Sequence, residues 1–297
     1  NQAAESKIEK GVTMDLAVLS DIHGNYIALS RCVEYALDQG ITTFLFLGDY
    51  LGELAYPENT MKIIYQMKEQ YQCYFIKGNK EDYWLNHRAD GGQGWKECDS
   101  TTGSLLYTYS HLTHKDFAFY ESLPMKRELT FPDMPPMTVC HGSPEKINEN
   151  MFSDRKETYE IIEREKNLLL LCGHTHVQDK IEYKGKTALN PGSVGVPLFS
   201  GGKSQFMILH EMEKKWKEEF ISLSYDVEKV IYELHECGLD VKAPCWCKVT
   251  EHLLRNGSIC HAQVLSRAME LCKEEKGFCN WPDIPEKCWE KAVKELL

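Results

Sequence analysis

The sequence predicts an α/β fold built on a largely parallel, buried sheet. Short apolar runs alternate with helical patterns over about the first 90 residues, and each run ends at a glycine beside Asp, Asn or His. Apolar runs bounded by glycine are typical of strands buried on both faces, and strand–helix alternation is typical of parallel sheets. Five runs share this form: LAVLSDIHGN (16–25), TTFLFLGDYLG (42–52), CYFIKGNKED (73–82), MTVCHGSP (137–144) and LLLLCGHTHV (168–177).

Helical patterns connect the first strands. Apolar residues recur at helical spacing over Tyr26–Gln39 and over Asn59–Gln70, which follows Pro57. Asp90–Asp99 contains three glycines and is predicted as a loop, and Thr101–Ser122 is predicted to be helical and to lead away from the sheet.

The chain then returns to strands. Two short strands at 127–131 and 137–140, and a helix at 155–166, precede the GHTH run. The next segments are predicted to be strands of a second, more antiparallel layer. These segments are 180–189, 204–210 and 215–223.

The last part of the chain is predicted to be a helical extension. Residues 262–272 and 289–296 carry amphipathic stripes, which we expect to pack on the main domain or on a second copy as a homo-oligomer. The predicted organisation is a polar leader or expression remnant at 1–13, a main domain at 14–225 and this helical extension at 226–297.

Bulk properties exclude several classes of protein. The net charge of −11 argues against a nucleic-acid polymer as the main partner. No apolar run is long enough to cross a membrane, and the first residues lack the apolar stretch of a signal peptide, which favours a cytoplasmic protein. The twelve cysteines are therefore expected as reduced thiols. A structural zinc is the less favoured alternative, since Cys245 and Cys247 do not form a paired CxxC knuckle.

The five strand ends carry side chains that bind metals. In such sheets, ligands sit outside the carboxyl ends of the strands, so these side chains can converge. Carboxylate, imidazole and amide groups suit divalent Mn, Fe, Zn, Co or Ni. Seven ligands are too many for one tetrahedral ion but suit two ions that share a carboxylate, about 3.5–4 Å apart, an arrangement that handles displacement at phosphorus. The seven are Asp21, His23, Asp49, Asn79, His141, His174 and His176.

The GHTH motif supplies two of these groups from one loop. We expect His174 and His176 to point the same way, because side chains two apart in an extended chain share a face. Each can then serve a different ion.

The order D-x-H, GD, GN, H, GHTH resembles the calcineurin-like metallophosphoesterase superfamily, and most of all its small bacterial and archaeal phosphodiesterase branch. Residues 20–25 (SDIHGN), 141–144 (HGSP), 190–197 (NPGSVGVP) and 225–228 (YDVE) carry the resemblance, which covers about 14–235. It implies a four-layered αββα sandwich. It also implies hydrolysis of a small phosphate ester, more often a diester, by a metal-bound hydroxide.

The resemblance also implies which group serves which ion. The first ion would be held by Asp21, His23 and His176. The second would be held by Asn79, His141 and His174, with Asp49 bridging the two.

Other residues are expected around this site. Asn25 and Ser193, the latter in the NPGS turn, are candidates for contact with substrate or with the histidines; the alternative is that NPGS only makes a tight turn. His252 and His261, on the extension, are expected to be remote, so that changing them leaves metal binding and activity intact.

One position departs from the family. Many members have a histidine after GN, the presumed helper of the leaving group, whereas this chain has Lys80. Lys80 could stabilise charge on the transferring group or act as the acid, and an exposed bystander is the alternative. His111 and His114 are further candidates for the acid. The departure puts monoesters with poor leaving groups in doubt.

Two other functions fit the same resemblance. The superfamily includes the retromer subunit, a protein-binding scaffold with a degenerate catalytic site, and a scaffold has no reason to keep all seven groups. It also includes phosphomonoesterases and the Ser/Thr protein phosphatases, whose motif after GN differs from GNKED (78–82).

Overall fold

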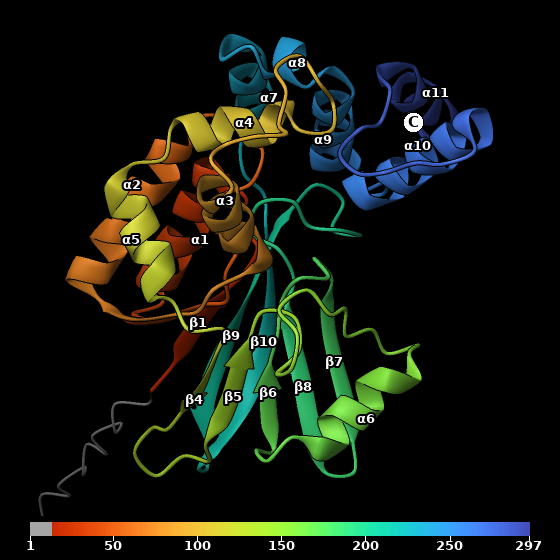
Figure 1. Ribbon diagram of the computed structural model, residues 1–297. Coiled ribbons are helices and arrows are strands. Elements are labelled where there is room, and N and C mark those ends of the chain that lie inside the picture. Colours follow the sequence, from red (N-terminus) through yellow and green to blue (C-terminus); the bar gives the residue numbers. More distant parts are fainter. Residues whose placement is uncertain (1–13) are drawn as a thin grey trace, which may run out of the picture.

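The computed structural model describes residues 14–297, so the predicted leader at 1–13 lies outside the described residues. Two five-stranded mixed sheets stand face to face (Figure 1). The first has the strand order β10–β9–β1–β2–β3, with β1, β2 and β3 parallel and β9 and β10 antiparallel. Its strands are β1 (Leu16–Leu19), β2 (Thr43–Phe46), β3 (Gln72–Phe75), β9 (Ser204–Met212) and β10 (Lys215–Leu223).

The second sheet has the order β4–β5–β6–β8–β7. Its central strands β5, β6 and β8 are parallel, and the edge strands β4 and β7 are antiparallel to their neighbours. Its strands are β4 (Lys126–Leu129), β5 (Met137–Cys140), β6 (Leu169–Leu171), β7 (Gln178–Tyr183) and β8 (Lys186–Pro191).

The residues of β1 show how the layers are held together. Successive side chains of a strand point to opposite faces. Leu16 and Val18 pack into the core between the sheets, where they join Val139 and Leu171 of the second sheet. The side chain of Leu19 belongs to the other core, between the first sheet and its covering helices. A run that is apolar on both faces therefore marks a strand covered on both faces.

Helices cover the outer face of each sheet (Figure 1). The helices α1, α2 and α5 share one core with the first sheet, and α6 shares another with the second sheet. This arrangement confirms the predicted α/β sandwich. The helices of this part are α1 (Tyr26–Asp38), α2 (Pro57–Gln70), α3 (Asn79–Ala89), α4 (Gly103–Ser110), α5 (His114–Ser122) and α6 (Lys156–Arg164).

The extension is helical and docks on the main domain. Its first helices share a core with main-domain residues, including Leu54, Tyr107 and Val196. Its last helices form a core of their own around Trp289, whose Nε1 donates a hydrogen bond to Thr101 Oγ1 at 2.9 Å. The helices are α7 (Val227–Glu236), α8 (Leu239–Lys242), α9 (Pro244–Asn256), α10 (His261–Lys276) and α11 (Glu286–Leu296).

The assignment of 204–210 and 215–223 to the second layer is wrong. β9 pairs with the free edge of β1, Leu16 opposite Leu209, and β10 pairs with β9. Alternating apolar residues show that a segment is a strand, but they do not say which strand it joins. The five strand ends therefore belong to two sheets: β1, β2 and β3 come from the first, and β5 and β6 from the second.

Two other predicted elements are also corrected. The single strand at 180–189 is the hairpin β7–β8, because Lys184 and Gly185 both have positive φ, which tight hairpin turns require. Thr101–Ser122 is two helices, since Thr113 caps a new helix by accepting a hydrogen bond from Asp116 N. The helix α3, which follows the GN motif directly, was not expected.

The cysteines are free thiols, as predicted. No helix in the described part of the chain is long and apolar enough to span a membrane.

Trp289→Ala tests the docking of the last helices. The side chain is fully buried, so its removal should lower the free energy of unfolding by about 3–5 kcal/mol. Urea denaturation measures this, with Phe278→Ala as control because Phe278 is 63% exposed. Equal stability of the two variants would contradict the docked arrangement.

Candidate metal centre

The loop after β1 is placed by the loop after β2. Asp21 N and His23 N donate to the carbonyls of Gly48 and Asp49, at 3.2 and 3.0 Å. Asp21, His23 and Asp49 all have φ between 51° and 53°, in the left-handed region. Such conformations are uncommon outside glycine and cluster at functional sites. The tertiary contacts therefore hold all three side chains in one arrangement.

Two glycines let the GD and GN loops touch. A Cβ on Gly48 would lie 2.3 Å from Gly78 N, and a Cβ on Gly78 would lie 2.2 Å from Asp49 Oδ1. Neither position can accept a side chain. The close approach allows Lys80 N to donate to Asp49 Oδ1 at 2.8 Å, which leaves Asp49 Oδ2 facing the centre of the site.

Glu81 ties these two loops together, and the sequence reasoning missed it. Its carboxylate accepts hydrogen bonds from Asp49 N at 3.0 Å, Tyr50 N at 3.0 Å and Gly78 N at 2.7 Å. Burial and the neighbouring Asp49 raise the pKa of Glu81 to about 7. A signal was available, since a Glu three residues after a helix cap is the second half of a capping box.

The second sheet contributes His141, which follows β5. Its Nδ1–H donates to the carbonyl of Leu47, at 2.7 Å, at the end of β2. This bond places the ring so that Nε2 lies 3.5 Å from Asp49 Oδ2 and 3.1 Å from Asn79 Oδ1. Because the bond to Leu47 uses the Nδ1 proton, the neutral ring keeps a free lone pair on Nε2, the form that binds metals.

The GHTH loop reaches the same point, but it is not extended as predicted. His174 and His176 have φ of 68° and 60°, so a tight left-handed loop, and not strand alternation, aims them at the site. His176 Nε2 lies 3.1 Å from Asp21 Oδ1. The ring of His174 lies 5.2 Å, centroid to centroid, from that of His141. The amide of His174 donates to Asp21 Oδ2 at 3.0 Å.

The structure thus brings all seven predicted groups together, and the ligand atoms of five of them fit a metal. The ligand atoms of Asp21, His23 and His176 lie within 4.8 Å of one another, as do those of Asp21, Asp49 and His141. Asp21 Oδ1 and His23 Nε2 are buried, and neither makes a hydrogen bond of good geometry in the described residues, although His176 Nε2 lies 3.1 Å from Asp21 Oδ1 and Asp49 Oδ2 lies 3.4 Å from His23 Nε2. Buried polar atoms without a partner are costly, and a divalent ion between them would satisfy both.

The electrostatics of the cluster favour added positive charge. Burial lowers the pKa of His23 and of His141, but the surrounding carboxylates outweigh it and raise these values to about 9 and about 10. Burial raises the pKa of Asp49, yet His141 and His23 lower it to about 2. His174 differs, because burial and the nearby His141 lower its pKa to about 4. The carboxylates of Asp21 and Asp49 therefore attract cations to the cluster.

Asn25 and Ser193 lie behind the site and do not line the cleft. Asn25 Oδ1 caps α1 by accepting from Ala28 N, and its Nδ2 donates to the carbonyl of Gly195 at 2.9 Å. Ser193 Oγ donates to the carbonyl of Asp21 at 2.7 Å. Both side chains are buried. They support the loop that carries Asp21 and His23, which makes them positioning groups.

Lys80 does line the cleft, together with a carboxylate that the sequence did not reveal. Lys80 Nζ forms an ion pair with Glu53 Oε1. The other oxygen of Glu53 lies 3.7 Å from His23 Nδ1. Burial lowers the pKa of Lys80, but Glu53 outweighs it, so the net shift is upward. Glu53 thus lies between the lysine and a candidate ligand.

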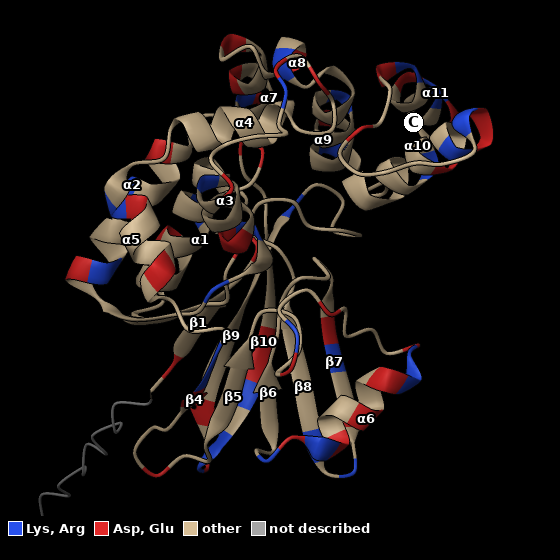
Figure 2. Cartoon of the chain, in the orientation of Figure 1, with Lys and Arg blue, Asp and Glu red and all other residues tan. Residues whose placement is uncertain are grey.

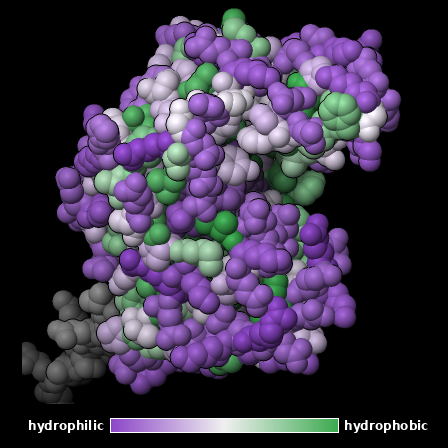
Figure 3. Space-filling model, in the orientation of Figure 1, coloured by the Kyte–Doolittle hydropathy of each residue, from purple (hydrophilic) through white to green (hydrophobic). Residues whose placement is uncertain are grey.

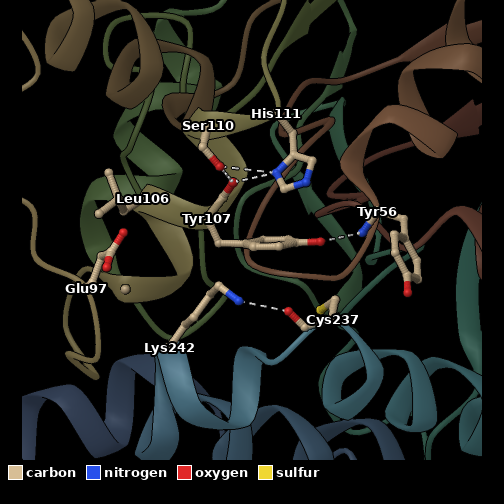
Figure 4. A pocket seen from close by; sticks show the side chains of 9 residues that line it. Tyr56, Glu97, Leu106, Tyr107, Ser110, His111, Cys237 and Lys242 are labelled. Atoms are coloured by element: carbon tan, nitrogen blue, oxygen red, sulfur yellow. Dashed lines mark hydrogen bonds between the residues drawn. The ribbon is translucent and has the colours of Figure 1, made fainter.

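His111 and His114 are not brought to the site. His111 lines a separate cavity of about 450 Å³, where its Nδ1 contacts the carbonyl of Tyr107 at 2.8 Å and Lys242 donates to the carbonyl of Cys237 (Figure 4). His114 begins α5 and is exposed. Neither is among the residues that line the cleft beside the seven groups.

The cleft has a volume of about 380 Å³, and the extension lines part of it. Its wall includes His261, so the expectation that His261 is remote is wrong. Trp246, Leu253, Cys260 and Ala262 of the extension line it as well. The sequence shows which residues are helical here but not where the helices dock.

Glu81→Gln tests the role of this buried carboxylate. An amide in its place puts an N–H donor against backbone N–H groups, so the free energy of unfolding should fall by about 1–3 kcal/mol. Urea denaturation measures the loss. Glu69→Gln, an exposed change on α2, is the matched control. Equal midpoints for both variants would show that Glu81 does not hold the loops.

Comparison with known proteins identifies the family. An uncharacterised protein of Methanocaldococcus jannaschii is 27% identical over 235 residues, which cover 72% of this chain and 89% of that protein. The crystal structure of a hypothetical protein from Pyrococcus horikoshii has a TM-score of 0.68 at 19% identity and covers 82% of this chain and 98% of its own. A metallophosphoesterase from Sphaerobacter thermophilus has a TM-score of 0.60 at 20% identity, with coverage of 76% and 94%. The sequence model of the calcineurin-like phosphoesterase superfamily domain matches residues 14–215, and the chain belongs to this superfamily.

Proposed function

We propose that the protein is a hydrolase of small phosphate esters that depends on two divalent metal ions. The observation that carries the proposal is a pair of buried atoms that make no hydrogen bond of good geometry, Asp21 Oδ1 and His23 Nε2, at the centre of a carboxylate–imidazole cluster beside a cleft. A cluster built only for stability would pair these atoms. Family membership supplies the reaction class.

The proposed ligand sets follow the positions of the seven groups. Asp21, His23 and His176 would hold one ion, since their ligand atoms lie together. Asn79, His141 and His174 would hold the second, with Asp49 bridging, because Asp49 Oδ2 lies 3.4 Å from His23 Nε2 and 3.5 Å from His141 Nε2. Such ligands accept Mn, Fe, Zn, Co or Ni. When bound, the ions would act as Lewis acids on phosphoryl oxygens and would activate water.

The chain's own residues would orient the ester and balance its charge. Lys80 is the lysine among the described residues that line the cleft, and its positive charge lies beside the proposed metal ligands. We propose an electrostatic role for Lys80, because, against the effect of burial, Glu53 raises the pKa of its ammonium group and so makes it a weaker acid. The proposal favours diesters over monoesters, because Lys80 stands where many members of the family have the histidine that helps the leaving group.

The surface supports a small substrate. In Figure 2, acidic and basic residues lie side by side on α2, on α6 and at the end of α10. A nucleic-acid polymer would need a basic stripe.

Contact between two copies through the C-terminal helices stays part of the proposal, supported by the exposed Phe278 and Trp281.

Asp49→Ala tests the metal site. The variant should lose at least one of two ions per chain and more than about 100-fold in kcat/KM, because even changes to groups that only orient ligands cost 10–100-fold. Elemental analysis and hydrolysis of bis-(p-nitrophenyl) phosphate after metal reconstitution measure the two effects. Asp38→Ala, at the exposed end of α1, is the control. Two ions still bound to Asp49→Ala would refute the ligand assignment.

Lys80→Ala separates the two catalytic roles. The variant is assayed on two diesters, one with a p-nitrophenolate leaving group and one with an alkoxide leaving group. An electrostatic role predicts similar losses of kcat on both, whereas an acid role predicts a large loss on the alkoxide ester alone. Unchanged rates on both esters would make Lys80 a bystander.

A further inference from the structure

The C-terminal extension builds one wall of the metal cleft. Trp246 comes from α9 and His261 from the first turn of α10, and both line the same cleft as His23 and Lys80. Figure 3 shows the molecule hollowed beneath the C-terminal helices, with apolar residues in the hollow. Clefts of roughly 300–1,000 Å³ enclose small ligands, and this one is larger than a phosphate group requires.

This wall is attached to the metal ligands through a continuous path. Leu198 N donates to the carbonyl of His176 at 2.9 Å, and the next amide, Phe199 N, donates to the carbonyl of Gly257, just after α9, at 2.7 Å. On the other side, Leu253 packs in one core with main-domain residues that include Leu54. The extension is therefore fixed relative to the ions' ligands.

The wall presents a flat and neutral surface. The rings of Trp246 and His261 are stacked, with centroids 4.2 Å apart and planes 23° apart. Thr250 Oγ1 donates to the carbonyl of Trp246, so it must accept its 2.7 Å hydrogen bond from His261 Nε2–H. This fixes the orientation of the ring. Burial also lowers the pKa of His261, to about 3, which keeps the imidazole uncharged.

The charge inside the cleft limits what can lie on this surface. The described residues that line the cleft include one lysine, Lys80, and no arginine. Lys80 is paired with Glu53. A second phosphate or carboxylate on the substrate would find no unpaired lysine or arginine in the lining and would meet Glu53. The same cleft is also lined by the apolar residues Phe152, Val196, Leu198 and Leu253, and by the uncharged polar residues Asn150 and Thr175.

We propose that the stacked pair Trp246–His261 is the specificity-determining surface of the enzyme, and that it holds the non-reacting substituent of the phosphate ester. This inference rests on the proposed phosphoesterase function. The substituent is uncharged and flat, either aromatic or heteroaromatic, because stacking and apolar contact are what the wall offers. The extension thereby selects the substrate, while the main domain performs the hydrolysis.

Three p-nitrophenyl diesters test the proposal. Their second substituents are benzyl, methyl and 2-carboxyethyl, so all share one leaving group and report by release of p-nitrophenolate. The metal-reconstituted full-length protein should prefer the benzyl to the methyl ester by about 10-fold in kcat/KM, and should disfavour the carboxyethyl ester. In Trp246→Ala and His261→Ala the benzyl-to-methyl ratio should fall toward 1, mainly through a higher KM for the benzyl ester.

The controls separate binding from folding. Trp281→Ala removes an indole of the extension that is 46% exposed and lies outside the cleft, so the ratio should stay at the wild-type value. Trp246 also contacts Trp289, at 5.9 Å between centroids, so Trp246→Phe provides a milder change. Bound metal and the thermal midpoint show whether each variant is folded.

Two outcomes count against the proposal, and they differ. If the wild-type protein hydrolyses the esters but the ratio is near 1, or is unchanged in both Trp246→Ala and His261→Ala, the specificity surface is refuted and the phosphoesterase function stands. If the metal-loaded protein releases p-nitrophenolate from none of the esters, the proposed function fails, and this inference fails with it.

Discussion

The hydrogen bond from His141 Nδ1 to the carbonyl of Leu47 joins the two sheets at the point where their strands end. Leu47 follows β2 of the first sheet and His141 follows β5 of the second. The bond fixes the His141 ring, turns Nε2 toward Asp49 and Asn79, and brings the groups of one sheet within reach of those of the other. The contacts of His141 Nε2 with Asp49 and Asn79 depend on this junction.

A cluster of this kind is costly to build. Buried carboxylates and imidazoles lose their hydration, and some of their atoms stay unpartnered. Groups around the cluster offset part of that cost. Glu81 accepts three amides of the GD and GN loops, Ser20 Oγ donates to Asp21 Oδ2 at 2.6 Å, and Glu53 faces His23. These groups hold the ligands in place, whereas the unpartnered atoms keep the site receptive to cations.

The docked extension encloses the site and forms one side of the cleft. On the main domain alone, the seven ligands would lie at an open sheet edge, as ligand sites of α/β proteins do. With α9 and α10 docked, the same edge becomes a cleft with an aromatic wall. Residues from both parts of the chain thus line one cleft. The family's fold can then keep one chemistry while the extension differs.

The sequence by itself determined the parallel strands β1, β2 and β3 of the first sheet, the seven convergent groups and the family. These are local features, because an apolar run followed by glycine and a polar residue indicates a strand and its end without reference to the rest of the chain. Tertiary structure decided the rest, because the rest depends on partners distant in the chain. β9 pairs with the edge of β1 that β2 leaves open, and the sequence of β9 does not specify this partner. His176 lies beside Asp21 because its loop is left-handed, and no local sequence pattern predicts that conformation. His261 reached the cleft because α9 docks against Leu54 and Val196. The periodicity of a helix shows which face is apolar, but only packing decides what that face covers.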